Sequence, residues 1–276
     1  MTETPRTFRR TPMVARPTTA APQTAPAAPG DAGGKGDEGP FLLVLDAETR
    51  PDRSAAPEGD DALKPMFHAV AALAFLRCRI LQDGGEEWYE ALECRAGGKP
   101  RTSEADLLSG FWKSFEAWKP RLVTFNGRGF VLPVLKYRSM RQMMTARYLH
   151  EAGDKWSGYG HRYSLTHHID MMDVLSDHHA STFPSLPEVA AALDIPLPAK
   201  SGDTEAAQGE AGIEAARAAA ESDVVAIYLA YLRWRLFTGK ITREGHAKSV
   251  ASLRRCLESS SKGRPHLAAA ASGLKE

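Results

Sequence analysis

The chain has few cysteines, and its charges nearly cancel. Only Cys78, Cys94 and Cys256 occur among 276 residues, and no two of them form a Cys-x-x-Cys pair. This scarcity argues against a disulfide scaffold or a thiolate zinc site and is typical of a reducing cytoplasm. The formal net charge is +1, so the surface as a whole is not basic. Any contact with nucleic acid must therefore depend on a local patch.

Long apolar runs are also missing. No apolar stretch approaches the roughly 20 residues needed to cross a bilayer, and the first residues do not form a secretory signal. We therefore expect no membrane partner. With 43% hydrophobic and 25% charged residues, the chain is long enough to bury one sizeable core.

Composition divides the chain into three parts. Residues 1–40 are rich in Thr, Ala and Pro and lack apolar density, so we expect a disordered, solvated tail. Residues 41–258 predict one folded domain, and residues 259–276 predict a flexible C-terminal tail.

Hydrophobic periodicity within the domain alternates between that of strands and that of helices. Residues 67–80 and 88–94 predict two strands that follow a first strand in a meander. Ser103 predicts the start of an amphipathic helix. Further segments extend this alternation: a strand at 121–126, a helix from about 130, a short strand near 169, and helices at 186–193 and 223–237. Strands followed by helices around a mixed sheet indicate an α/β domain.

Two carboxylates end the first apolar run. Asp46 and Glu48 follow five apolar residues, as in a strand that is buried on both faces. Because side chains at i and i+2 of a strand point to the same face, both carboxylates can reach one divalent metal ion. A third carboxylate, Asp223, lies in the early turns of the predicted late helix. Carboxylates gathered in this way suit metal-dependent phosphodiester hydrolysis.

Several motifs, in order, resemble those of a bacterial family of predicted 3′-5′ exonucleases related to the proofreading domain of family B DNA polymerases. This family falls within the ribonuclease H-like DEDD exonucleases, and the similarity covers most of residues 41–240. The matching segments are Leu-Asp-Ala-Glu-Thr from residue 45, Asn-Gly-Arg-Gly-Phe-Val-Leu-Pro-Val-Leu from 126, His-His-Ile-Asp-Met-Met-Asp-Val-Leu from 167 and Ser-Asp-Val-Val-Ala-Ile-Tyr-Leu-Ala-Tyr-Leu-Arg from 222.

The resemblance implies a fold, an activity and a set of site residues. The implied fold is a ribonuclease H-like mixed β-sheet of six strands flanked by α-helices. The implied activity is two-metal hydrolysis of single-stranded DNA from its 3′ end, with one or two Mg²⁺ or Mn²⁺ ions held by Asp46, Glu48 and Asp223. The resemblance also places Asn126 and Phe130 near the terminal nucleotides.

The chain departs from the family pattern at two positions. Val131 stands where the family has an acid after the aromatic residue, and a valine cannot ligate a metal. Ala219 stands where the family has a tyrosine one helical turn before Asp223. These departures predict reduced activity. They leave open the alternative of a nucleic-acid-binding pseudo-exonuclease without turnover.

Other polar residues complete the candidate site. Asp170 is the best candidate to substitute for the missing acid, but we rather expect it to be a structural residue or to support a metal ligand. Lys200 either matches a family lysine that can face phosphate or is a solvated loop lysine. Arg128 begins a set of cations and tyrosines that either lines a single-strand channel or forms a solvated helix face; the others are Lys136, Tyr137, Arg138, Arg141, Arg147 and Tyr148. A histidine-carboxylate metal centre within 167–179 is a less favoured alternative, because its spacing fits no zinc signature.

Overall fold

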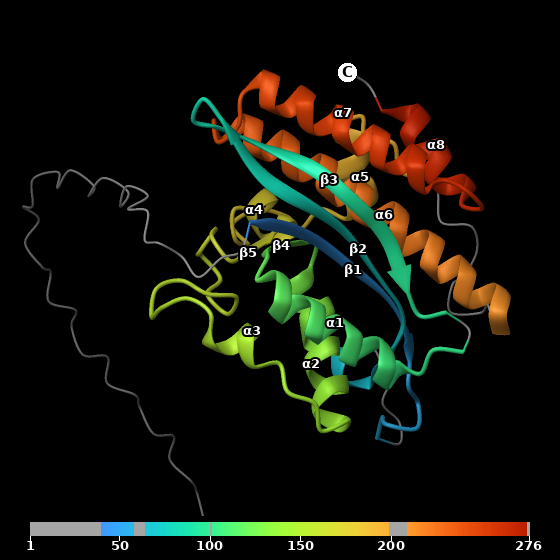
Figure 1. The fold of residues 1–276 in the computed structure, drawn as a ribbon. Helices are drawn as coiled ribbons and strands as arrows, with labels where there is room; N and C mark the ends of the chain where they lie inside the picture. The colour runs from blue at the N-terminus through green and yellow to red at the C-terminus, as the bar shows by residue number, and fades with distance from the viewer. Residues whose placement is uncertain (1–39, 58–63, 100, 199–208, 275–276) are drawn as a thin grey trace, which may run out of the picture. The chain divides into compact units, whose positions relative to one another are not determined.

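A mixed sheet of five strands lies at the centre of the part of the chain that the computed structural model describes, residues 40–57, 64–99, 101–198 and 209–274 (Figure 1). The strand order is β3-β2-β1-β4-β5. The strands are β1 (Phe41–Pro51), β2 (His68–Asp83), β3 (Glu86–Gly97), β4 (Arg121–Thr124) and β5 (His168–Asp170). The first three form an antiparallel meander, whereas β4 and β5 run parallel to β1. The family resemblance implied six strands, and the described residues contain five.

Helices cover both faces of this sheet (Figure 1). On one face lie α1 (Glu104–Trp118) and α2 (Leu132–Arg141), and on the other lies α6 (Gly209–Phe237). Outside or beside α6 lie α5 (Leu186–Ala192), α7 (Arg243–Ser260) and α8 (Pro265–Gly273). Shorter elements join them: the 3-10 turn η1 (Pro65–Phe67), the π-helical turn η2 (Gly127–Val131), α3 (Arg147–Glu151) and α4 (Met171–Leu175). This is the mixed β-sheet flanked by α-helices that the sequence predicted.

The alternation of β1 separates two hydrophobic clusters. Leu42 and Val44 belong to the cluster that contains α6, α7 and α8. Leu43 and Leu45 belong to the cluster with α1 and α2. Because successive strand side chains point to opposite faces, even-numbered residues of this segment face α6.

Most of the predicted elements are confirmed, with different ends. The segments 67–80 and 88–94 are β2 and β3, and Ser103 caps α1 by accepting a hydrogen bond from the Asp106 N–H at 3.1 Å. The late helix is much longer than predicted, since α6 begins at Gly209. The helix expected from residue 130 begins with η2 and continues as α2.

The prediction of a flexible tail at 259–276 is wrong for most of its length. Residues 265–273 form α8, whose Leu267, Ala270 and Ala271 are buried in the cluster around α6. Small alanines let this helix pack closely, so tertiary contacts order a segment that has little amphipathic pattern. The predicted tail at 1–40 lies, apart from residue 40, outside the described residues.

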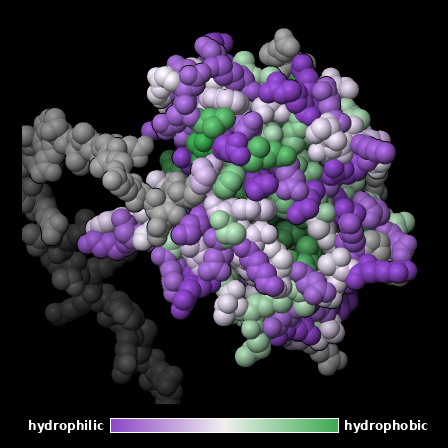
Figure 2. Space-filling view, viewed as in Figure 1, coloured by the Kyte–Doolittle hydropathy of each residue, from purple (hydrophilic) through white to green (hydrophobic). Residues whose placement is uncertain are grey.

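The face of the protein that Figure 2 shows is largely polar. Figure 2 shows hydrophobic side chains on this face as small separate patches among hydrophilic ones. Among the described helices, none combines the length and apolar character that crossing a membrane requires.

Candidate metal centre

Asp46 and Glu48 project from β1 toward α6. They continue the even-numbered positions whose apolar members, Leu42 and Val44, pack in the α6 cluster. The register of β1 against β2 shifts between Glu48 and Thr49. Bulges of this kind are frequent next to active sites, because they redirect side chains.

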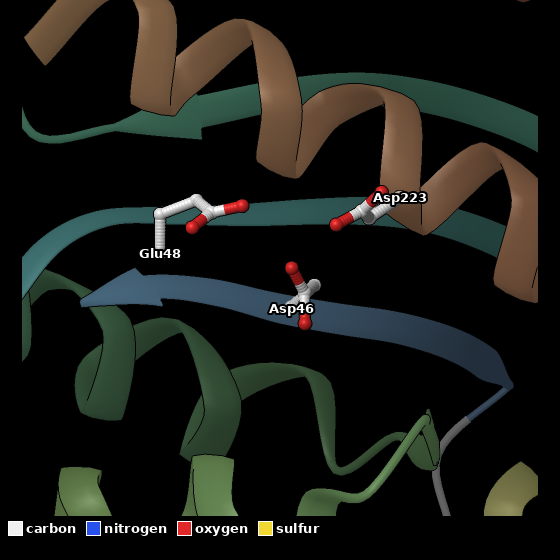
Figure 3. A group of neighbouring side chains, drawn as sticks. All are labelled: Asp46, Glu48 and Asp223. Carbon is white, nitrogen blue, oxygen red and sulfur yellow. The ribbon is translucent and has the colours of Figure 1, made fainter. Parts of the chain in front are cut away.

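Asp223 approaches the same space from α6. The residues that follow it, Val224, Val225 and Ile227, are fully buried, so the helix is held firmly against the sheet. Figure 3 shows all three carboxylates pointing into the space between β1 and α6. One carboxylate oxygen from each of Asp46, Glu48 and Asp223 lies within 4.8 Å of the other two. Within the described part of the chain, this is the one group of three or more potential metal-ligating side chains.

The donor set fits a hard divalent cation. All three ligands are carboxylate oxygens, which Mg²⁺, Mn²⁺ and Ca²⁺ prefer over softer metals. Two ligands on opposite sides of an ion, each at about 2.4 Å, lie about 4.8 Å apart. The separations in the structure therefore suit one ion held jointly by β1 and α6 without a rearrangement of the backbone.

The two degenerate positions add no further ligand. Val131 is 3% exposed and belongs to the apolar cluster on the α1 face of the sheet. Ala219 lies on α6, one turn before Asp223, and is half-buried. No fourth acidic, histidine or cysteine side chain joins the three carboxylates within the described residues.

Close packing shapes the segment that contains Asn126 and Phe130. Asn126 has a left-handed backbone with φ 54°, and its carbonyl accepts a hydrogen bond from the Phe130 N–H at 2.9 Å. A Cβ on Gly127 would stand 2.0 Å from Thr124 Oγ1, so only glycine fits there. The Phe130 ring meets that of His68 edge-on, with centroids 5.0 Å apart.

His68 links this segment to the end of β1. Its Nδ1 atom lies 2.9 Å from the hydroxyl of Thr49, the residue that follows Glu48. Phe130 therefore lies beside the strand that carries two of the three carboxylates. Asn126 and Phe130 are both half-buried.

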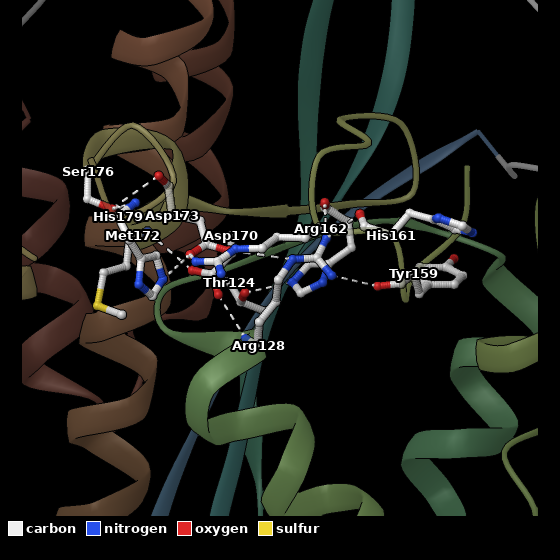
Figure 4. Close-up of polar contacts among 11 residues, drawn as sticks. Thr124, Arg128, Tyr159, His161, Arg162, Asp170, Met172, Asp173, Ser176 and His179 are labelled. Atoms are coloured by element: carbon white, nitrogen blue, oxygen red, sulfur yellow. Dashed lines mark hydrogen bonds and ion pairs between the residues drawn. The ribbon is translucent and has the colours of Figure 1, made fainter. Parts of the chain in front are cut away.

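Arg128 has a structural role, contrary to the expectation that it contacts nucleic acid. Its guanidinium donates hydrogen bonds to the carbonyls of Tyr159, His161 and His168, at 2.9, 3.1 and 2.9 Å (Figure 4). These bonds attach the loop before β5, and the first residue of β5, to the matching segment that begins at Asn126, here called the second motif. A guanidinium that is committed to three carbonyls has few donors left for phosphate.

Asp170 supports the same turn. Its carboxylate accepts hydrogen bonds from the backbone N–H groups of Arg128, at 2.8 Å, and Met172, at 3.2 Å. Burial raises the pKa of Asp170 above its ordinary value, although the N–H of Arg128 acts in the opposite direction. Asp170 therefore holds the backbone of the second motif, and it does not belong to the group of three carboxylates found among the described residues.

The remaining cations of the predicted channel are mostly paired. Arg138 bonds Glu104 and Asp52 at 2.6 and 2.7 Å, and Arg141 bonds Asp52 at 3.0 Å. Arg147 pairs with Glu151 on α3 at 3.2 Å. Arg138 and Arg141 therefore contact neighbouring segments and Arg147 pairs within its own helix, which does not support a continuous single-strand channel. Lys200 lies outside the described residues.

The histidine-rich segment also has structural partners. His168 is buried, with Nε2 2.8 Å from the Thr124 hydroxyl. His179 lies 3.1 Å from the Asp173 carboxylate, which Arg162 also contacts. No described histidine belongs to a metal-ligating group, so the alternative of a histidine-carboxylate centre is wrong for this part of the chain.

One residue near the site was missed by the reasoning from sequence. Glu221, two residues before Asp223, is 1% exposed and accepts hydrogen bonds from the Ala96 N–H, Arg264 and His266 at 2.7, 3.1 and 2.7 Å. These contacts fix α6 against β3 and against α8. Because Arg264 and His266 lie 43 and 45 residues further along the chain, no local pattern signals the role of Glu221.

Comparisons with solved structures give distant similarities. The family B DNA polymerase of Pyrobaculum calidifontis aligns with 81% of this chain at 17% identity and a TM-score of 0.46, over 29% of its own length. The zinc-bound complex of Escherichia coli exonuclease I with single-stranded DNA aligns with 79% at 12% identity and a TM-score of 0.35, over 45% of its length. The chain thus spans less than half of each of these proteins. The comparison with curated proteins gave no match.

The family assignment depends on a sequence match. A family described as a predicted 3′-5′ exonuclease related to the exonuclease domain of PolB matches residues 60–272. The match includes the second motif, Asp223 and most of α8, and it begins after Asp46 and Glu48. Those two residues are therefore assigned to the candidate site from the geometry of β1 and α6 and not from the family match. Since the match covers most of the sequence, the chain belongs to this family of predicted 3′-5′ exonucleases.

Proposed function

We propose that the protein is a metal-dependent 3′-5′ exonuclease that acts on single-stranded DNA ends, with lower activity than a member that has the full ligand set. The observation that carries this proposal is the meeting of three carboxylates, from β1 and α6, within 4.8 Å in a chain of an exonuclease family.

Asp46, Glu48 and Asp223 would hold Mg²⁺ or Mn²⁺ between the sheet and α6. When bound, the ion supplies charge neutralisation at the phosphate and lowers the pKa of the attacking water. The chain contributes the position of the site, because buried residues hold β1 and α6 in place. Asn126 and Phe130, beside the end of β1, would orient the terminal nucleotides.

Reduced activity is expected from the two degenerate positions. The aliphatic side chain of Val131 offers no oxygen to a second ion or its water, and Ala219 offers no hydroxyl near Asp223. The same substitutions support a second candidate function, that of a nucleic-acid-binding protein without turnover. In both cases a single-stranded 3′ end is the partner.

We also propose that the protein is located in the cytoplasm. The three buried free cysteines are consistent with this location.

The test uses oligonucleotides labelled at either end, with Mn²⁺, and measures the length of the products. We expect slow shortening from the 3′ end by wild type and none by Asp46→Asn. Glu116→Gln, which alters an exposed acid on α1, is the matched control and should leave the rate unchanged. Shortening that persists at the wild-type rate in Asp46→Asn would show that the assigned carboxylates are wrong.

Metal binding is tested separately from cleavage. An ion that binds only the folded protein stabilises it by about 2.7 kcal/mol at a concentration of a hundred times its Kd. Mn²⁺ should therefore raise the Tm of wild type and of Glu116→Gln, but not that of Asp46→Asn. A Tm shift without cleavage would favour the binding protein over the exonuclease.

A further inference from the structure

A cavity opens directly beside the candidate metal centre. It has a volume of about 290 Å³, and Asp223 forms part of its wall. The opposite wall comes from α5, with Leu186, Pro187 and Ala191, and from Ile195 and Leu197 in the segment after this helix. Asp223 thus belongs both to the wall of the cavity and to the candidate metal centre.

Contacts at both ends of α5 and on its inner face hold this helix in place. Ser185 and Glu188 form a reciprocal capping box at its start, and Val189 and Ala190 on its inner face are buried in the cluster with α6. At its end, the Ile195 N–H donates to the Ala190 carbonyl at 2.8 Å. The cavity thus has firm walls on the sides that α5 and α6 form.

The lining of the cavity is almost entirely apolar. Apart from Asp223, the described residues that line the cavity are leucine, isoleucine, alanine and proline. Such a wall binds an apolar, compact group and offers no side-chain hydrogen bond to it. The occupant must also be attached to something that can approach the carboxylate of Asp223, and a divalent ion with its phosphate meets that requirement.

We propose that this cavity receives a nucleobase of the substrate strand, whose neighbouring phosphate lies at the three carboxylates. This inference rests on the proposed function. A base is joined to its phosphate by one sugar, so a phosphate beside Asp223 brings a base to the cavity. Because the described residues of the wall offer no donor or acceptor side chain besides Asp223, all four bases are accepted alike.

The test substitutes a bulky side chain at an exposed residue that lines the cavity, so that the new side chain occupies it. Ala191 is exposed and lines the cavity, whereas Ala192, its exposed neighbour on α5, does not. Binding of two fluorescent single-stranded oligonucleotides is measured by anisotropy in Ca²⁺: one is complete, and the other lacks the bases of its last three nucleotides. The proteins are wild type, Ala191→Trp and the matched control Ala192→Trp, and their Mn²⁺ affinities are measured in parallel.

We expect Ala191→Trp to bind the complete strand about tenfold more weakly than wild type and Ala192→Trp do. All three proteins should bind the baseless strand equally, and their Mn²⁺ affinities should agree, which shows that the variant is folded. If Ala191→Trp and Ala192→Trp bind the complete strand alike, or if Ala191→Trp loses as much affinity for the baseless strand, the base cavity is wrong while the proposed function stands. If wild type binds neither Mn²⁺ nor either strand, both are wrong.

Discussion

The Nε2 atom of His266 donates a hydrogen bond to the Glu221 carboxylate over 2.7 Å, which joins α8 to α6 only two residues from Asp223. Arg264 Nη1 contacts the other carboxylate oxygen at 3.1 Å. Since Glu221 also accepts from the Ala96 N–H of β3, one buried side chain ties three elements together. The helix that replaces the expected C-terminal tail is thereby coupled to the part of α6 that carries the candidate ligand.

Replacing this carboxylate should destabilise the fold. Glu221→Gln removes the charge that Arg264 and His266 face, and we expect the free energy of unfolding to fall by about 2 kcal/mol. Urea denaturation measures the change. The control is Glu214→Gln on the same helix, whose exposed side chain pairs with Arg217, and this change should cost about 0–1 kcal/mol. Equal losses in the two variants would contradict the role of Glu221.

Acid should weaken the contact between the end of β1 and α2. The hydrogen bond from Ser54 and the contacts of Arg138 and Arg141 lower the pKa of Asp52 from 3.8 to about 2. A carboxyl with a lowered folded-state pKa stabilises the protein above its unfolded value and loses that effect as pH falls through the folded value. Wild type should therefore exceed Asp52→Asn in stability above pH 3.8, and the difference should shrink as the pH falls toward 2.

Urea titrations of both proteins at several pH values test this expectation. Glu90→Gln, which affects an exposed pair with Arg79, serves as the control. A difference between wild type and Asp52→Asn that stays constant down to pH 2 would mean that the ion pairs of Asp52 contribute nothing.

Introducing an acid at residue 131 of the second motif should distinguish a weak exonuclease from a binding protein without turnover. Val131→Asp should raise the Mn²⁺-dependent rate about tenfold or more, because loss of a ligand or its supporting partner typically costs 10–100-fold. It should also lower the Tm, since residue 131 is 3% exposed in an apolar cluster. The uncharged Val131→Asn should lose stability without the gain in rate. If Val131→Asp binds Mn²⁺ as wild type does and still cleaves nothing, the binding protein is favoured.

The sequence predicted those parts of the structure that depend on local pattern. The alternation along β1 was enough to place Asp46 and Glu48 on one face, and the cap at Ser103 marked the start of α1. Bringing Asp223 to the same place required the family resemblance, because nothing local connects a strand to a helix so much later in the chain. That long-range meeting is present in the structure.

The misses share a physical cause, which is that the decisive partners lie far away in the sequence. The sequence predicted that Arg128 contacts nucleic acid, whereas in the structure its guanidinium donates hydrogen bonds to two carbonyls of a distant loop and one of β5. The first turns of α6 and all of α8 are rich in alanine and show weak hydrophobic periodicity. Tertiary packing stabilises these helical segments, so the sequence pattern alone did not predict them.

The two-faced alternation of β1 limits how its length can change during evolution. Deleting or inserting one residue between Leu42 and Asp46 would turn both carboxylates toward the apolar side of the sheet and would direct leucines at α6. Substitutions along this strand can accumulate one at a time. A shift of the strand register by one residue, in contrast, moves every side chain to the opposite face of the sheet at once. Among relatives of this chain, we therefore expect gaps in β1 to be rarer than changes of residue type.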